Sequence, residues 1–290
     1  GVIEGEPVKD LNKLPFPNYD FVNLERYHRI VEGSPSISIL SSRGCPFNCY
    51  FCNSRVSQRG GVRFRAPSHV AYEIEVLKRK YRTSNFRFSD DLFAFSEKRV
   101  GEMSEALQPL NIIYRIFAQA RIFASTKDIA KNLYKSGCRH VAFGIESMSD
   151  KMLGILGKAS TVEENKRALD YARLAGLKTR IYLMVGFPGE TEETIEKSLR
   201  TVMSCDFDEF IVYAFIPYPG TPVWYEPKKW GIRNIDRDFS KYVQVGRDRS
   251  TCFAIETDEF TPTDVEKWRS YMIMELEKKF SWAGESKDNK

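Results

Sequence analysis

The sequence predicts an α/β fold in which six β/α units form a parallel sheet and a helical extension follows at the C-terminus. Three observations predict this fold. Short apolar runs of strand length alternate six times with stretches of helical periodicity, at a spacing typical of barrels. The chain of 290 residues is long enough for one large α/β domain. Beyond Pro217 the alternation gives way to turn-forming residues and one last helical stretch.

Six segments are expected to be strands of the sheet. In chain order they are Ser36–Ser42, Asn85–Phe88, Ile112–Ala118, His140–Ile145, Thr179–Val185 and Glu209–Ile216. Because a helical stretch follows each of them, the strands should run parallel.

Each expected helix begins with a residue that can cap it. The first has apolar residues at helical spacing from Val70 to Tyr81. The third should close at Gly137 and the fourth near Gly176. In chain order the capping residues are Ser68, Ser96, Thr126, Thr161 in a capping box with Glu164, and Thr191; Thr263 with Glu266 opens a last amphipathic helix to about Phe280.

Composition excludes several classes of protein. Hydrophobic residues make up 42% and charged residues 29%, as in ordinary globular proteins. We see no apolar run of membrane-spanning length and no leader-like start. The net charge of +5 comes from 44 basic and 39 acidic residues that are well mixed, which argues against nucleic acid but leaves room for a basic pocket for an anionic substrate. Three of the six cysteines, Cys138, Cys205 and Cys252, are isolated, so we expect no disulfide framework and a reducing cytoplasm.

A cluster of three cysteines follows the first strand directly. Cys45, Cys49 and Cys52 have the spacing CxxxCxxC. Three thiolates so close together are typical of a metal centre. A 4Fe–4S cluster normally takes one cysteine on each iron, so three cysteines leave one iron open. An open coordination position favours chemistry over a purely structural site.

This motif, with the aromatic Phe51 before its last cysteine, resembles the signature of the radical S-adenosylmethionine (SAM) superfamily. The resemblance implies a partial (β/α)6 TIM-like barrel whose chemistry lies at the C-terminal ends of the strands. It implies that the open iron binds SAM, which a reduced cluster cleaves to a 5′-deoxyadenosyl radical. It further implies an electron donor such as flavodoxin or ferredoxin and a small-molecule substrate.

Two other interpretations of the cysteines remain open at this point. The three thiols could bind zinc with His69 as a fourth ligand, or Cys49 and Cys52 could form a thioredoxin-like CxxC pair. The motifs at the later strand ends fit neither.

We divide the chain into three parts. Residues 1–35 form an N-terminal arm, 36–225 the barrel and 226–290 a C-terminal extension. Two prolines among aromatics, from Leu14 to Asp20, favour an extended or turning segment that packs on a surface. This segment resembles the one that joins a cobalamin-binding domain to the radical domain in related proteins. The chain is therefore expected to be part of a longer protein, with an ordinary arm as the alternative.

The second and third strand ends carry charged residues. In the family, the second strand end binds the SAM ammonium group; here it has Asp90 and Asp91, of which only one should face SAM because neighbouring strand residues point to opposite sides. A turn-forming acidic pair is the alternative. At the third strand end, Gln119 and Arg121 are candidates for binding the SAM carboxylate or an anionic substrate, and a rim charge is the alternative.

The later strand ends also resemble family segments. At the fourth, Glu146 and Ser147 belong to a Gly-Ile-Glu-Ser segment, in which the resemblance assigns Glu146 to the ribose hydroxyls. At the fifth, Gly186 begins a segment that the family uses against the adenosine, although the fuller glycine motif is not matched and Glu190 alternatively favours only the next helix. At the sixth, Pro217 begins a segment similar to one that closes over adenine and substrate.

The resemblance implies a cobalamin-dependent radical SAM enzyme, with methyl transfer as the expected reaction. There, one SAM would supply the radical and another would remethylate cobalamin. One alternative is a cobalamin-independent radical SAM oxidation or rearrangement. The other is a non-catalytic zinc or iron–sulfur module. The sequence does not identify the substrate.

Overall fold

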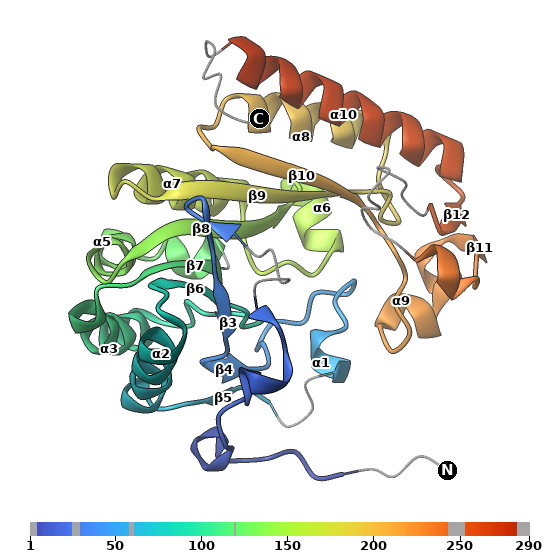
Figure 1. Cartoon of the computed structure of the whole chain (residues 1–290). Helices are drawn as coiled ribbons and strands as arrows, with labels where there is room; N and C mark the ends of the chain where they lie inside the picture. Colours follow the sequence, from blue (N-terminus) through green and yellow to red (C-terminus); the bar gives the residue numbers. More distant parts are fainter. Residues whose placement is uncertain (1–4, 25–29, 58–60, 119, 243–252, 283–290) are drawn as a thin grey trace.

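A computed structural model describes residues 5–24, 30–57, 61–118, 120–242 and 253–282. Six parallel strands form one sheet in the spatial order β10-β9-β8-β7-β6-β3 (Figure 1). Their bounds are β3 Ile37–Ile39, β6 Asn85–Phe88, β7 Ile113–Ala118, β8 Cys138–Glu146, β9 Lys178–Val185 and β10 Glu209–Ala214. The predicted α/β fold with six β/α units is confirmed.

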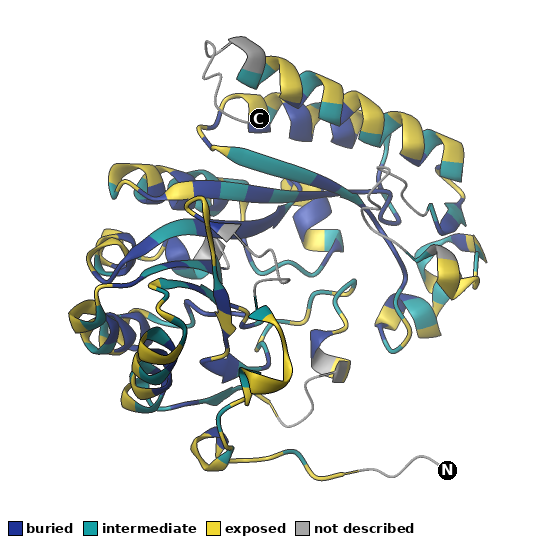
Figure 2. Ribbon diagram, in the orientation of Figure 1, coloured by how far each residue is buried: buried dark blue, intermediate teal, exposed yellow. Residues whose placement is uncertain are grey.

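Helices follow the strands in sequence. They are α2 Pro67–Tyr81, α3 Glu97–Leu107, α4 Ala120–Phe123, α5 Lys127–Lys135, α6 Asp150–Ile155, α7 Val162–Leu174, α8 Glu192–Met203 and α9 Pro222–Tyr225. The central strands are mostly buried, whereas the outer faces of the helices are exposed (Figure 2). Four helices begin at the predicted capping residues: the side chains of Ser96, Thr126, Thr161 and Thr191 each accept a backbone N–H of the first helical turn.

The predicted C-terminal extension forms a long helix, α10 Pro262–Trp282, beside α8 and over the edge strand β10 (Figure 1). The predicted capping box at Thr263 is wrong. Thr261 and Asp264 bond each other's backbone N–H groups instead, and Pro262 occupies the first turn, where no N–H is needed. Before this helix, β11 Ile232–Ile235 lies antiparallel to β12 Ile255–Thr257, and Ile232 and Ile255 are both buried.

The first strand is shorter than predicted. The ladder ends at Ile39, since the backbone N–H of Ser41 bonds Asp90 instead of a neighbouring strand. The chain then turns into a two-stranded hairpin, β4 Ser42–Arg43 with β5 Arg63–Phe64, followed in sequence by α2. Ser68 does not cap α2: the helix begins at Pro67 after Ala66, and its first N–H groups have no side-chain cap. The short helix α1, Ser54–Ser57, lies inside the hairpin's connection.

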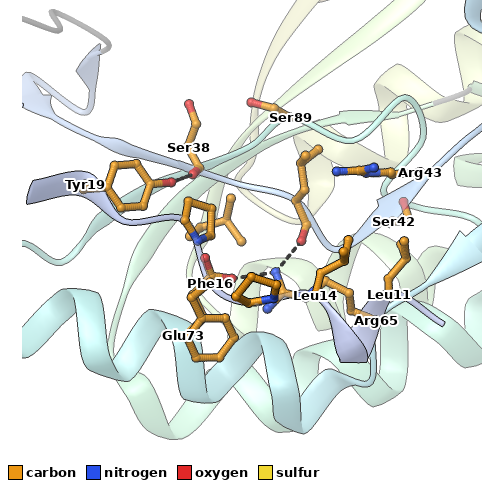
Figure 3. A pocket seen from close by; sticks show the side chains of 14 residues that line it. Leu11, Leu14, Phe16, Tyr19, Ser38, Ser42, Arg43, Arg65, Glu73 and Ser89 are labelled. Atoms are coloured by element: carbon orange, nitrogen blue, oxygen red, sulfur yellow. Dashed lines mark hydrogen bonds and ion pairs between the residues drawn. The ribbon is translucent and has the colours of Figure 1, made fainter. Parts of the chain in front are cut away.

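The N-terminal arm packs on the outer edge of the sheet, as its proline and aromatic pattern predicts. The Tyr19 hydroxyl donates to the carbonyl of Ser38 in the edge strand β3, 2.9 Å away. Asn12 accepts the N–H of Ala66 at the start of α2. A cavity of about 300 Å³ lies between the arm and β3, above the buried Arg65–Glu73 ion pair (Figure 3). A small hairpin, β1 Ile30–Val31 with β2 Ser34–Pro35, joins the arm to β3.

Candidate iron–sulfur and SAM site

The three cysteines lie in the loop between β4 and α1, beyond the C-terminal end of β3. All three are free thiols and half-buried. The loop leaves the hairpin at Gly44, where φ is +90° and a Cβ atom would lie 2.6 Å from the carbonyl oxygen of Gly61. Only glycine fits this close approach, which sets the direction in which the loop starts.

Asp91 ties the two ends of the cysteine loop together. One carboxylate oxygen accepts the Gly44 N–H at 3.0 Å, and the other accepts the Ser54 hydroxyl at 2.6 Å. The Ser54 N–H in turn donates to the sulfur of Cys52 at 3.4 Å. Asp91, which follows β6, therefore fixes the cysteine loop, which follows the neighbouring strand β3 and the short strand β4.

Asp90 has a different position from its neighbour. Its buried carboxylate accepts three hydrogen bonds from the segment that follows β3. The donors are the N–H and hydroxyl of Ser41, at 3.0 and 2.8 Å, and the hydroxyl of Ser42, at 2.5 Å. Burial raises its pKa despite these hydrogen bonds. The two predicted aspartates thus have different surroundings: Asp91 contacts the cysteine loop, and Asp90 is buried inside the fold.

Glu146 and Lys158 form a buried ion pair beside the loop. Glu146 ends β8 with φ +64°, a conformation unusual for a residue other than glycine. Its carboxylate lies 3.2 Å from the Lys158 ammonium, and the side chains are 11% and 7% exposed. The ammonium lies 5.9 Å from the centre of the Phe51 ring. Ser147 is buried and accepts the Ser149 N–H, so it shapes the turn into α6.

Burial raises the pKa of all three thiols, that of Cys49 to about 11. The positive charge of Lys158 opposes this rise at each of them. Without a metal the thiols are therefore protonated at neutral pH, and metal binding must release protons.

The donor set consists of three thiols, the type of ligand that iron–sulfur clusters take in proteins. His69, the proposed fourth zinc ligand, accepts a hydrogen bond from Arg65 and packs on Phe16.

Comparison with protein families decides the identity. Residues 39–202, more than half of the chain, match the model of the radical SAM superfamily. The chain belongs to this superfamily. The radical SAM family carries a 4Fe–4S cluster and SAM as cofactors, which agrees with the cysteine loop.

Two curated relatives cover most of this radical SAM chain. It is 32% identical over 230 residues to an uncharacterised methyltransferase of Pyrococcus horikoshii, a match that spans 77% of this chain and 49% of the relative. It is 27% identical to an anaerobic magnesium-protoporphyrin IX monomethyl ester cyclase of Rubrivivax gelatinosus, over 81% and 42% of the two chains. The chain thus spans about half the length of these relatives.

Solved structures share the radical SAM fold. The methyltransferase TsrM of Kitasatospora setae, with cobalamin and a 4Fe–4S cluster bound, matches 70% of this chain and 40% of its own, with a TM-score of 0.60 and 21% identity. The cobalamin-dependent enzyme OxsB, with aqua-cobalamin and SAM bound, matches 86% and 45%, with a TM-score of 0.65 and 15% identity. At these identities the likeness concerns the fold.

Of the remaining predicted residues of the radical SAM site, Gly186 and Pro217 lie just beyond the ends of β9 and β10. Gln119 lies outside the described residues, as does the isolated Cys252, and Arg121 is in α4 but its side chain is not described. Gly186 has a packing reason to be glycine, since a Cβ atom would lie 2.6 Å from Val265 of α10. Pro217 is buried just beyond β10.

No role was predicted for Lys158, because only the tertiary fold brings its ammonium to the cysteine loop. An aromatic layer is formed by Phe117 of β7, Tyr182 of β9 and Tyr213 of β10. The ring centres of Phe117 and Tyr182 lie 5.9 Å apart, and those of Tyr182 and Tyr213 lie 5.7 Å apart. Gly144 leaves the space in which Phe117 and Glu146 approach each other.

Because the carboxyl group of Glu190 is buried, we predict that the free energy of unfolding depends on pH. Its buried carboxyl accepts the N–H of Gly186 at 2.5 Å, and burial raises its pKa from 4.5 to about 8 although the N–H groups of Gly186 and Phe187 lower it. Between these values the folded chain holds a proton that the unfolded chain releases, so stability falls as pH rises from about 4.5 to about 8.

We expect Glu190→Gln to remove this slope, which amounts to at most about 1.4 kcal/mol per pH unit. Chemical denaturation at several pH values measures it. Glu192, an acidic residue in the first turn of α8 with no such burial, is the control position for a Gln replacement. Parallel pH profiles for the parent and Glu190→Gln would contradict the assignment.

Proposed function

We propose that this chain is the catalytic core of a cobalamin-dependent radical SAM methyltransferase. The observation that carries the proposal is the loop of three cysteines, held by Asp91 at the C-terminal end of the parallel sheet. Three cysteines hold a cluster with one open iron. When bound there, the cluster supplies one electron to SAM, whose cleavage gives a 5′-deoxyadenosyl radical.

We assign different residues of the chain to the cluster and to SAM. Cys45, Cys49 and Cys52 are assigned to the cluster, and the ring of Phe51, in the same loop, faces the Lys158 ammonium. Of the acidic pair, we assign the SAM ammonium to the Asp91 side, because Asp91 is only half-buried and contacts the cysteine loop, whereas Asp90 is buried inside the fold.

The later strand ends are assigned to the rest of SAM. Gln119 and Arg121 are assigned to the SAM carboxylate or to an anionic substrate. Glu146 and Ser147 are assigned to the ribose, with Glu146 as the acceptor. Gly186 and Pro217 are assigned to the adenosine.

The substrate is proposed to be a small molecule above the aromatic layer of Phe117, Tyr182 and Tyr213. Phe117 stacks on Tyr182 in this layer, and the ring of Tyr213 packs on Tyr182 at a tilt. Aromatic rings offer an apolar surface that shields a radical from water.

Methyl transfer is supported by the name of the Pyrococcus horikoshii relative and by the cobalamin-bound enzymes that share the fold. The cyclase of Rubrivivax gelatinosus favours a second candidate, a radical SAM oxidation or ring closure at the same site. An electron donor such as flavodoxin or ferredoxin and a cytoplasmic location complete the proposal. No helix among the described residues is long and apolar enough to cross a membrane.

The test begins with anaerobic reconstitution, followed by SAM and dithionite. We expect 5′-deoxyadenosine to form, and intact SAM would contradict the proposal. The full-length protein that contains this chain should also bind cobalamin. A protein that cleaves SAM but does not bind cobalamin would favour the second candidate over methyl transfer.

A further inference from the structure

The segment from Leu156 to Lys158 lies directly against the cysteine loop. The Tyr50 N–H donates to the carbonyl of Leu156 at 3.0 Å. Gly157 is so close that a Cβ atom would lie 2.9 Å from the Tyr50 ring and 3.1 Å from the carbonyl oxygen of Asn48. These contacts fix the position of Lys158 relative to the three cysteines.

Lys158 is buried although lysine is rarely buried. Its ammonium pairs with Glu146 at 3.2 Å and faces the Phe51 ring, which lies between two of the cysteines in sequence. A buried ion pair is often no more stable than apolar side chains of the same volume. Stability alone therefore does not account for this pair.

The surrounding backbone makes room for the pair. A Cβ atom at Gly144 would lie 2.7 Å from the Glu146 carboxylate and 3.1 Å from the Lys158 nitrogen. Glu146 itself takes a positive φ, a strained conformation that clusters at functional sites. Gly144 and Glu146 therefore together place the Lys158 ammonium beside the cysteine loop.

The charges that face this cation are mostly negative. Glu146 and Asp91 are carboxylates near the thiols, and both act to raise thiol pKa values that Lys158 acts to lower. Three bound thiolates would add further negative charge, and reduction of a cluster adds one more. A cation in this position favours the reduced form.

We propose that Lys158 is a positioning residue whose ammonium, held by Glu146, raises the reduction potential of the cluster bound by Cys45, Cys49 and Cys52. This inference rests on the proposed function, since it requires the cluster. Nearby charge is among the factors that set the potentials of iron–sulfur clusters. The proposal therefore concerns a property that can be measured without turnover.

The test compares the parent with Lys158→Met and Lys158→Arg after anaerobic reconstitution, without SAM. Iron and sulfide content is measured first. The solution is then held at the midpoint potential of the parent cluster, and the reduced cluster is quantified by electron paramagnetic resonance. We expect the ratio of reduced to oxidised cluster to fall about tenfold in Lys158→Met and to stay within about twofold in Lys158→Arg.

Three results would overturn the proposal. One is an unchanged ratio in a Lys158→Met protein that holds its full cluster, and another is an equal fall in both variants. If Lys158→Met holds no cluster, Glu146→Gln is measured instead. Because this change removes a negative charge, we expect the ratio of reduced to oxidised cluster to rise. A ratio that stays the same or falls is the third result that would overturn the proposal. A parent that takes up no iron refutes the proposed function instead.

Discussion

Replacing Cys45, Cys49 and Cys52 together by alanine abolishes iron–sulfur uptake and SAM cleavage in our account. In the proposed function the three thiols are the cluster's protein ligands, and alanine offers no donor atom. We expect the parent to take up about four irons per chain and the variant to remain near zero. Iron and sulfide analysis after anaerobic reconstitution measures this, together with the formation of 5′-deoxyadenosine.

A matched control is available in the same chain. Cys205 is a buried free cysteine whose thiol bonds the carbonyl of Thr201 in α8. Its replacement by alanine should leave iron content at the parent level, because the site does not include it. A triple variant that keeps its iron, or a Cys205→Ala variant that loses it, would contradict the assignment.

Replacing Asp90 by alanine should lower the free energy of unfolding by about 3–5 kcal/mol. The change leaves the N–H and hydroxyl of Ser41 and the hydroxyl of Ser42 buried without their acceptor, and each such group costs about 1–3 kcal/mol. Chemical denaturation of the parent and the variant measures the difference.

Asp91→Ala is the matched comparison, because the neighbouring carboxylate is only half-buried. We expect a smaller loss of stability, about 1–2 kcal/mol, and a larger loss of iron, since Gly44 and Ser54 lose the group that joins the two ends of the loop. If Asp90→Ala is as stable as the parent but no longer binds SAM, then Asp90 faces SAM and the division of roles is wrong.

The fold could be predicted because its signals are local. Ser96, Thr126, Thr161 and Thr191 cap helices through bonds to residues two or three positions away, which a sequence displays directly. The errors occur where a distant residue decides. The first strand ends early because Asp90, 49 positions further on, takes the N–H of Ser41.

Two candidate caps were equally plausible at the start of α10, and the wrong one was chosen. Thr263 and Glu266 have the spacing of a capping box, but so do Thr261 and Asp264, which form it. Pro262 favours the earlier start, because proline is well suited to the first helical position.

The superfamily could be predicted from the cysteine motif, whereas the roles assigned to the site residues stay predictions. The spacing of the cysteines indicates a cluster, and the strand ends indicate which residues surround it. The sequence does not show that Asp90 and Asp91 bind different partners. Nor does it show that Lys158 returns to the cysteine loop, because that depends on how the segment around Gly157 docks on Tyr50.

The central claim is that this loop holds a cluster with an open iron that binds SAM. The most direct measurement is the electron paramagnetic resonance spectrum of the reduced, reconstituted protein with and without SAM. We predict the signal of a 4Fe–4S cluster and a clear change in it when SAM is added, because SAM occupies the open coordination position. A cluster signal that SAM leaves unchanged, or a protein that binds zinc and no iron, would contradict the account.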